Sequence, residues 1–425
     1  MRILKIALFL FLAVSSATTP ANAQAGGKNR AATGKQTALD SFLVDAVTRN
    51  WVAGSTAIIL QNGKIVYDKA FGFRDREAGI RMKTSDIFRI ASMTKPIVST
   101  AALILVERGK LNLDDEVAKY IPEFRHPTVL KTFNKEDGSY TTEPARSEIT
   151  VRQLLTHTSG IGYGFQDEKL NVIYQENGIP DLAITGNVTI GEKMKKLGTL
   201  PLGVQPGSKF FYGLSIDVLG YVIEVASGEP LDRFVTNNIL KPLKMDDTRF
   251  FLPDGKKDRL VTMYSDAKNQ PLTRIPEMNG NYNTLYPVRG ARTYFSGGSG
   301  LSSTTHDYAR FLQMILGGGE HNGVRILKQE TVSMMCSNQL GTLNLGRGNK
   351  FGFGFEIEQG NKAPNGARAG KLAWGGAFNT TFWIDPDRRS IAVLMTQAYP
   401  ASHSQALYGG FEKRVNEWLD NHNPL

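Results

Sequence analysis

The sequence predicts an α+β protein in which an antiparallel sheet is flanked by helices and a mostly helical domain is inserted between the two halves of the sheet. β-Rich runs near both ends of the chain are joined by short turn segments, which favours antiparallel pairing. Between them, short helical patterns, such as residues 151–155 and 217–226, alternate with long polar loops. We therefore place the sheet domain at residues 37–111 and 294–425, and the inserted domain at residues 112–293.

The sheet domain begins with a helix and a hairpin. Apolar residues at helical spacing predict an amphipathic helix over residues 38–52. Two β-rich runs follow at residues 55–61 and 64–73, and the pair Asn62-Gly63 separates them. Both residues of that pair tolerate a positive φ, which a tight turn between antiparallel strands requires. The sequence therefore predicts a β-hairpin.

The next element is a buried helix. Residues 97–106 are mostly apolar, and their Ala and Leu content favours a helix over a strand. Pro96 has no backbone N–H to donate inside a helix, so we expect the helix to begin just before it. Gly109 is expected to cap the end of the helix, because glycine adopts a positive φ at little cost.

The C-terminal part of the sheet domain carries a helix, three strands and a final helix. The first helix is predicted over residues 305–316, and the strands over residues 351–358, 380–385 and 391–396. Aromatic and aliphatic side chains recur at spacings near three and four over residues 404–419, which predicts a terminal helix packed on the sheet.

Composition excludes several classes of protein. The 425-residue chain is 41% hydrophobic and 21% charged, so a largely disordered chain is excluded. The single cysteine, Cys336, excludes a disulfide scaffold, an iron–sulfur protein and cysteine-based zinc sites. The six histidines never pair at ligand spacing, so we expect neither a metal nor a cofactor. The net charge of +10 comes from scattered Lys and Arg, which argues against a nucleic-acid partner.

The N-terminus predicts export. Two positive charges precede an apolar run at residues 6–14, and a small-residue cleavage signal ends at Ala23. We therefore assign residues 1–23 to a secretory signal peptide, and residues 24–36, rich in Gly, Ala and Lys, to a flexible leader. The apolar run is too short to span a bilayer, so the mature protein is expected in the periplasm without stable membrane insertion. An uncleaved membrane anchor is the alternative.

Ser92-Met93-Thr94-Lys95, at the predicted start of the buried helix, is the main candidate for chemistry. Residues three apart share a helical face, so Ser92 and Lys95 can share a hydrogen bond. Serine is a poor nucleophile until a neighbouring base takes its proton, and a desolvated lysine can act as that base because burial lowers a lysine pKa. Alone, the tetrapeptide is a weak signal, since a helix-capping serine followed by a solvated lysine is a commoner arrangement.

Five segments together resemble the serine β-lactamase and penicillin-binding-protein superfamily, in the order found in that family. The resemblance extends from about residue 39 to residue 418, and its motifs are most similar to the class C-like branch and the family VIII esterases. The family implies a β-lactamase/transpeptidase-like fold with a nucleophilic serine in S-x-x-K. The segments are FRIASMTK (88–95), LLTHTSG (154–160), YGLS (212–215), GGSGL (297–301) and WGG (374–376).

The resemblance gives Tyr212 a role in catalysis. In this branch a tyrosine begins a Y-x-N motif, and its phenol exchanges the proton of the nucleophile beside the lysine, here Lys95. A buried tyrosine bonded to backbone is the alternative. Leu214 stands where Y-x-N has the asparagine that binds the acylamino group of β-lactams, and a leucine side chain forms no hydrogen bond. Leu214 is expected at the substrate and argues against β-lactam turnover.

Trp374-Gly375-Gly376 stands where penicillin-recognising enzymes carry K-T-G on the edge of a strand. The missing Lys and Thr would meet a β-lactam carboxylate, whereas Trp and Gly imply an apolar subsite for a neutral acyl or alcohol group. Family position also places the backbone N–H of Ala377 with that of Ser92 in an oxyanion hole.

His157 raises the possibility of a Ser–His pair. In this family, however, the HTSG segment is a structural turn, so we expect a packed histidine. No G-x-S-x-G elbow occurs, which argues against an α/β-hydrolase fold.

The sequence thus predicts an exported serine hydrolase that cleaves carboxylic esters through an acyl-enzyme on Ser92, with Lys95 and Tyr212 as the base pair. The expected partner is a small-molecule ester. One alternative keeps the fold and changes the substrate to a β-lactam or a D-amino-acid peptide. A second is a non-catalytic binder of cell-wall fragments. Transfer of the acyl group to another alcohol is open, and the sequence does not set the oligomeric state.

Overall fold

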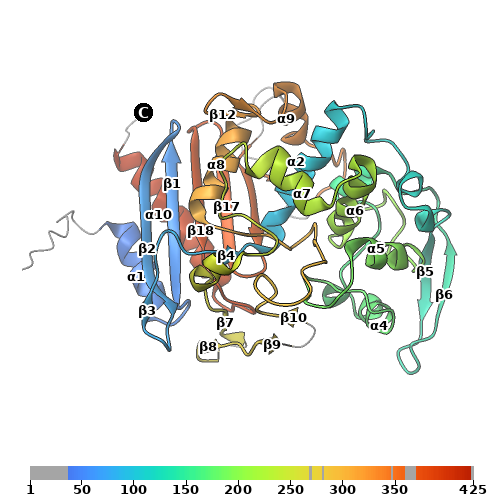
Figure 1. Ribbon diagram of the computed structural model, residues 1–425, viewed down its shortest axis with the longest axis horizontal. Coiled ribbons are helices and arrows are strands. Elements are labelled where there is room, and N and C mark those ends of the chain that lie inside the picture. Colours follow the sequence, from blue (N-terminus) through green and yellow to red (C-terminus); the bar gives the residue numbers. More distant parts are fainter. Residues whose placement is uncertain (1–36, 268–269, 280–281, 346–347, 359–369, 423–425) are drawn as a thin grey trace, which may run out of the picture. The chain divides into compact units, whose positions relative to one another are not determined.

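The fold is built on an antiparallel sheet whose strands come from both ends of the chain (Figure 1). The computed structural model describes residues 37–267, 270–279, 282–345, 348–358 and 370–422. Within them, the eight strands follow the order β14-β15-β16-β17-β18-β1-β2-β3, and every neighbouring pair is antiparallel. They are β1 (Gly54–Gln61), β2 (Lys64–Asp75), β3 (Ile80–Arg81), β14 (Lys350–Phe351), β15 (Glu356–Ile357), β16 (Leu372–Gly376), β17 (Thr380–Asp385) and β18 (Ser390–Met395).

The two halves of the sheet meet where β1 pairs with β18, in the register Thr56↔Met395 to Gln61↔Ser390. Alternate side chains of each strand point to opposite faces. On β1, Ile58 therefore joins the main core, whereas Ile59 joins a second, smaller core. The predicted fold class, an antiparallel sheet flanked by helices, is confirmed.

Helices cover both faces of the sheet (Figure 1). The second core lies under α1 (Ala38–Thr48) and α10 (Ser404–His422), which contact each other. On the opposite face, α8 (Thr305–Leu316) packs on β1 and β18, and α2 (Thr94–Glu107) lies in the main core. The apolar side chains of α1 and α10 recur at the helical spacing that predicted them.

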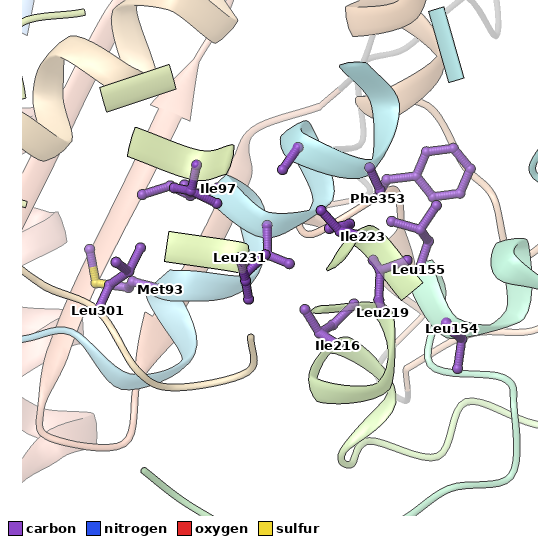
Figure 2. Close-up of a cluster of buried hydrophobic side chains, with 14 of the residues drawn as sticks. Met93, Ile97, Leu154, Leu155, Ile216, Leu219, Ile223, Leu231, Leu301 and Phe353 are labelled. Atoms are coloured by element: carbon purple, nitrogen blue, oxygen red, sulfur yellow. The ribbon is translucent and has the colours of Figure 1, made fainter. Parts of the chain in front are cut away.

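The buried helix α2 joins the sheet to the predicted insertion. All of its residues from Thr94 to Leu105 are buried, and α6 (Ser215–Ser227) packs against it. Figure 2 shows Ile97 of α2 in one apolar cluster with Ile223 of α6. Because the main core runs without a break across residues 112 and 293, the division of the chain there stays a prediction.

The predicted insertion holds short helices and small strand pairs. Only the hairpin of β5 (Thr128–Phe133) and β6 (Tyr140–Pro144) has strands of five residues or more in the described part of this segment. The helices are α3 (Val151–Leu155), α4 (Glu168–Glu176), α5 (Ile190–Gly198), α6 and α7 (Leu231–Val235), and the short strands are β7 (Tyr264–Ser265), β8 (Thr273–Arg274), β9 (Met278–Asn279) and β10 (Tyr282–Asn283).

Three local differences separate the structure from the sequence prediction. The helix predicted over residues 38–52 is shorter, because α1 ends at Thr48. The single strand predicted over residues 351–358 is wrong: β14 and β15 are two-residue strands joined by a turn. Gly354 in that turn has φ +98°, which breaks a strand although the flanking Phe residues keep a strand-like pattern. Strand β16 was not predicted as an element, because two glycines leave it without β-propensity.

In the described ranges, none of the helices combines the length and the apolar character that crossing a membrane would need. The predicted signal peptide (1–23) and leader (24–36) lie outside the described residues.

Candidate active site

Ser92 and Lys95 lie together at the start of α2. A short 3₁₀ turn, η1 (Ala91–Met93), leads into the helix, and Ala91 adopts φ +41°, a region that non-glycine residues rarely occupy. Ser92 is partly exposed, whereas Lys95 is fully buried. Lys95 Nζ donates a hydrogen bond of 3.1 Å to Ser92 Oγ. The structure therefore brings the two residues together on one helical face, as the motif predicted.

Two further acceptors surround the lysine. Nζ lies 3.0 Å from Tyr163 Oη and 2.9 Å from the carbonyl oxygen of Gly298. An ammonium group has three donors, and here each donor has a partner. In the described part of the chain no carboxylate forms an ion pair with Nζ, so the amine is held beside the serine by hydrogen bonds to neutral acceptors and by neighbouring aromatic rings.

Tyr163 is a site residue that the sequence analysis missed. Its phenol is buried, and its pKa is raised well above the usual range by burial and by the neighbouring Tyr212 and Asp217. The phenol is therefore neutral at physiological pH. Tyr163 lies three residues after the LLTHTSG segment, and a tyrosine so close to a recognised motif is a signal that could have identified it.

Tyr212 lies beside Tyr163 in the loop before α6, and the centroids of the two rings are 5.5 Å apart. Lys95 Nζ is 4.7 Å from the centroid of the Tyr212 ring, so the amine faces the ring. Tyr212 Oη is buried and has no hydrogen-bond partner among the described residues, which rules out the backbone-bonded alternative within them. The structure thus brings Tyr212 to the site, and its role in proton transfer stays a prediction.

Gly298, whose carbonyl oxygen accepts from Lys95, is held in place through its backbone N–H by the buried carboxylate of Asp217. Asp217 Oδ1 accepts a hydrogen bond of 2.6 Å from Ser296 Oγ and one of 3.2 Å from the backbone N–H of Gly298. Burial raises the pKa of Asp217, against the opposing effects of Ser296 and the Lys95 charge. The GGSGL segment is therefore a scaffold that fixes one of the three acceptors of the lysine.

The end of β16 lies beside the serine turn. β16 contacts η1, and a Cβ on Gly376 would come within 2.3 Å of the carbonyl oxygen of Ile90, so only glycine allows this approach. Ala377, which follows, is exposed. This places the predicted oxyanion-hole residues Ser92 and Ala377 on adjoining segments, and the pairing of their two N–H groups stays a prediction.

Aromatic rings form one wall of the site. Trp374 on β16 has its ring 5.5 Å from that of Tyr212 and 5.2 Å from that of Phe351, and its Nε1 has no partner among the described residues. Trp374 and Gly375 are partly exposed, as a substrate contact requires. Leu214 instead packs in the main core with 1% of its surface exposed, so the structure gives it a packing role and adds nothing to its predicted substrate contact.

His157 is a packed residue, as expected. It is fully buried, and burial, followed by the Lys95 charge, lowers its pKa well below the usual range, so the ring is neutral. Its ring lies 4.6 Å from that of Tyr212, and neither ring nitrogen has a partner among the described residues. No group of three His, Cys, Asp or Glu side chains in those ranges is arranged to hold a metal ion.

The chain is similar to known proteins along most of its length. A family model described as Beta-lactamase matches residues 39–410. The chain is 34% identical to Esterase EstB of Burkholderia gladioli over 372 residues, which is 84% of this chain and 89% of EstB. It is 31% identical to lovastatin esterase of Penicillium rubens over 289 residues, covering 66% and 67% of the two chains.

A solved structure is also similar. EstCE1, described as a hydrolase with promiscuous acyltransferase activity, superposes with a TM-score of 0.75 at 27% identity. The superposition covers 89% of this chain and 97% of EstCE1.

Proposed function

The chain belongs to the β-lactamase family and is an esterase-like serine hydrolase of that fold, and on this premise we propose that Ser92 carries an acyl-enzyme during ester cleavage. The observation that best supports the proposal is the 3.1 Å hydrogen bond between Lys95 Nζ and Ser92 Oγ at the start of a buried helix. It joins a nucleophile to an adjacent base, the arrangement that serine needs to become reactive.

The surroundings of Nζ fit a lysine that accepts the serine proton. An unprotonated amine has two N–H donors and one lone pair. Its donors match the acceptors Tyr163 Oη and Gly298 O, and its lone pair is then left for the Ser92 O–H. The same three contacts therefore fit both the neutral amine before attack and the ammonium formed once the amine has taken the serine proton.

In the proposed reaction, Ser92 Oγ attacks the ester carbonyl while its proton passes to Lys95. The backbone N–H groups of Ser92 and Ala377 stabilise the oxyanion of the tetrahedral intermediate. Lys95 and Tyr212 pass the proton to the leaving alcohol, and the acyl group stays on Ser92. Water then attacks the acyl-enzyme by the same route in reverse, releasing a carboxylic acid and restoring the serine.

Three features support esters over β-lactams. Leu214 offers no amide to an acylamino group, Trp374 replaces a charged residue, and the rings of Tyr212 and Phe351 pack against Trp374. The relatives EstB and lovastatin esterase are named as esterases. EstCE1 adds transfer to an alcohol as a second candidate outcome of deacylation, since it is described as having acyltransferase activity.

The test is hydrolysis of p-nitrophenyl butyrate. Ser92→Ala is expected to lower kcat by roughly a thousandfold or more, because the residual rate comes only from substrate binding and the oxyanion hole. Ser99→Ala, which removes another buried hydroxyl of α2, is the matched control and should keep normal activity. A Ser92→Ala protein with normal turnover would contradict the assignment.

The same purified protein distinguishes the ester hydrolase from the alternative functions. A fluorophosphonate probe that labels Ser92 excludes a non-catalytic binder. Parallel assays with nitrocefin and a D-Ala-D-Ala peptide measure the preference for esters, and added methanol shows whether the acyl group passes to an alcohol.

Export is part of the proposal and is supported by the apolar run at residues 6–14 and the small residues before Gln24. Expression in a Gram-negative host should give a periplasmic protein whose N-terminal sequence begins at Gln24. A cytoplasmic protein with an intact N-terminus would contradict it.

A further inference from the structure

A second cavity, apart from the catalytic serine, lies beside β4 (Phe88–Arg89). It has a volume of about 640 Å³, and its wall includes parts of β2 and β8, the segment between residues 257 and 263 that precedes β7, and the loop before Val288. In Figure 1 the short strands β7 to β10 lie together below the main sheet. Ser92, Lys95, Tyr163 and Tyr212 are not among its lining residues.

Arg89 in the wall of this cavity is a buried cation without a carboxylate partner. It is 1% exposed, and its Nη1 donates to the carbonyl oxygen of Val261 at 2.8 Å and to Gln397 Oε1 at 3.1 Å. Its Nε has no partner in the described part of the chain, where no carboxylate forms an ion pair with the guanidinium. Burying a charge that only neutral acceptors bond costs free energy of desolvation. An anion bound beside Arg89 would offset that cost.

The neighbouring phenol of Tyr282 is a second buried polar group that lacks a hydrogen-bond partner among the described residues. Burial raises the pKa of Tyr282, and the Arg89 charge opposes that effect, so the phenol and the guanidinium interact. Arg89 and Tyr282 are thus two interacting buried groups that each have an unbonded polar atom among the described residues, and Arg89 is the one that lines the cavity.

The other charges at the cavity are already compensated or solvated. Asp258 is exposed to solvent. The rest form ion pairs: Arg74 with Asp86 at 3.0 Å, Arg274 with Asp75 at 3.2 Å, Lys257 with Asp254 at 2.8 Å, and Glu277 with Arg289 at 2.6 Å. Arg89 is therefore the cation of this wall that an incoming anion would neutralise.

The rest of the wall determines which anion fits. Much of it is apolar, including Leu260, Met263, Ile275, Leu285 and Val288. Such a surface favours a ligand with a hydrocarbon body over a bare inorganic ion. We propose that this cavity is a second ligand site that binds a small carboxylate with an apolar chain, its carboxylate pairing with Arg89.

The site adjoins the segment that carries the nucleophile. Arg89 precedes Ser92 by three residues, and its backbone N–H and carbonyl are both bonded to the Gln397 side chain. Met263 and Ile275 belong to one buried cluster with Ala91, the residue before Ser92. A ligand in the cavity therefore contacts groups that pack directly against the serine turn.

The experiment titrates hexanoate into the purified protein at neutral pH by isothermal calorimetry, with hexanol and inorganic phosphate in parallel. Val288→Glu and Val288→Gln are a pair of equal size at a partly exposed wall position, and they differ in charge. We expect hexanoate to bind Val288→Gln saturably and Val288→Glu at least tenfold more weakly, because the added carboxylate repels the ligand and competes for Arg89.

If the Arg89→Gln variant folds, it should no longer bind hexanoate. If that variant does not fold, the comparison of Val288→Glu with Val288→Gln tests the proposal. Hexanoate bound at the catalytic centre would be equally tight in both Val288 variants. Equal affinities for the pair, equal binding of hexanol, binding of phosphate without hexanoate, or no saturable binding would each overturn the proposal. Because binding is measured without turnover, these outcomes are independent of whether Ser92 cleaves esters.

Discussion

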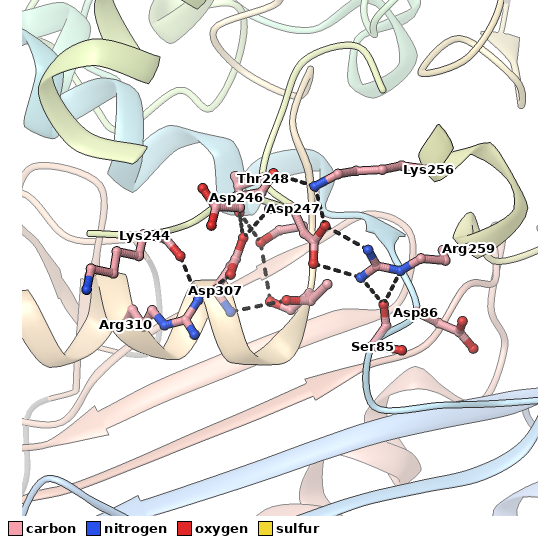
Figure 3. Close-up of polar contacts among 12 residues, drawn as sticks. Ser85, Asp86, Lys244, Asp246, Asp247, Thr248, Lys256, Arg259, Asp307 and Arg310 are labelled. Carbon is pink, nitrogen blue, oxygen red and sulfur yellow. Dashed lines mark hydrogen bonds and ion pairs between the residues drawn. The ribbon is translucent and has the colours of Figure 1, made fainter. Parts of the chain in front are cut away.

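The molecule has an ion-pair network in which opposite charges are paired, and a catalytic centre whose buried cation has no carboxylate partner among the described residues. The ion-pair network consists of Asp247, Lys256, Arg259, Asp307 and Arg310 (Figure 3). Arg259 forms two hydrogen bonds to the Asp247 carboxylate, at 2.8 and 2.7 Å, and Lys256 lies 2.6 Å from the same group. Asp307 accepts bonds from the Asp247 backbone N–H and from Arg310.

The catalytic centre, defined as Ser92, Lys95, Tyr163, Tyr212 and Trp374, is bonded less completely. Its buried cation has no carboxylate partner, and two buried polar atoms, Tyr212 Oη and Trp374 Nε1, have no partner in the described ranges. Unsatisfied groups of this kind cost about 1–3 kcal/mol each when buried. We infer from this difference that the ion-pair network stabilises the fold. The catalytic centre instead keeps polar atoms without partners, which a substrate can bond.

The largest expected effect separates the two regions by activity. Lys95→Met keeps a long apolar side chain but removes the base, so kcat/KM for p-nitrophenyl butyrate should fall by roughly a thousandfold. Circular dichroism should show that the fold persists. Lys119→Met, at a mostly exposed lysine paired with Asp115, is the control and should keep normal activity. Normal turnover by Lys95→Met would remove the lysine from the mechanism.

The second effect separates them by stability. Asp247→Ala leaves Arg259 and Lys256 without their shared carboxylate, and urea unfolding should show a loss of about 2 kcal/mol. This is below the cost for a fully buried pair, because these side chains are 23–29% exposed. Activity per folded molecule should not change. Asp254→Ala, at an 81% exposed carboxylate paired with Lys257, should leave stability unaltered. A variant that folds normally but loses turnover would break the comparison.

The sequence predicted those elements of the sheet domain whose patterns are local, although it missed the short strands β3 and β16. α8 (Thr305–Leu316) and β17 (Thr380–Asp385) have the boundaries expected for them, and Asn62 and Gly63 both adopt positive φ in the hairpin turn. The strand expected at residues 351–358 fails at Gly354, because its φ of +98° depends on packing against α2. Alternation of apolar residues contains no information about that contact.

The site was predictable to the extent that it is local. Ser92 and Lys95 are three residues apart on one helix, so their contact follows from helical geometry. The bond from Lys95 to Tyr163 spans 68 residues, and that to Gly298 spans 203. Such contacts depend on how the main core closes, which no local pattern contains. Asp217 escaped notice for the same reason, since its partners Ser296 and Gly298 come from a distant loop.

A smaller effect on kcat distinguishes the roles of the two phenols beside Lys95, those of Tyr163 and Tyr212. Tyr163→Phe removes a 3.0 Å hydrogen bond to Nζ while keeping the ring that stacks on Phe165, so kcat should fall by about tenfold. Tyr212→Phe removes a phenol with no partner in the free enzyme. If Tyr212 carries the proton, its loss should lower kcat more than the loss of Tyr163, with KM little changed. The reverse order, or a near-normal rate for Tyr212→Phe, would transfer the proton-carrying role to Tyr163.

The smallest effect concerns two carboxylates, the partly exposed Asp247 and the buried Asp217, whose pKa values move in opposite directions. For Asp247, burial raises the pKa, but Arg259 and Lys256 outweigh it and the net pKa is lowered. For Asp217, burial dominates and the pKa is raised. Stability changes with pH wherever the folded and unfolded chains bind different numbers of protons. Asp247 should therefore stabilise the fold above its unfolded pKa of about 3.9, a contribution lost as pH falls through the lower folded value.

Asp217 has the opposite sign. Its folded pKa lies above its unfolded value, so the folded state holds the proton longer and loses stability as pH rises through that window. Asp217→Asn keeps an acceptor for Ser296 and removes the charge. Its stability relative to the wild type should therefore rise from about pH 4 and then level off. Asp247→Asn should instead lose relative stability up to about pH 4 and then stay constant. Urea unfolding of the three proteins between pH 3 and 7 tests this. Parallel curves for the two variants would show that Asp247 in the ion-pair network and Asp217 behind the catalytic centre do not differ in how their charges affect stability.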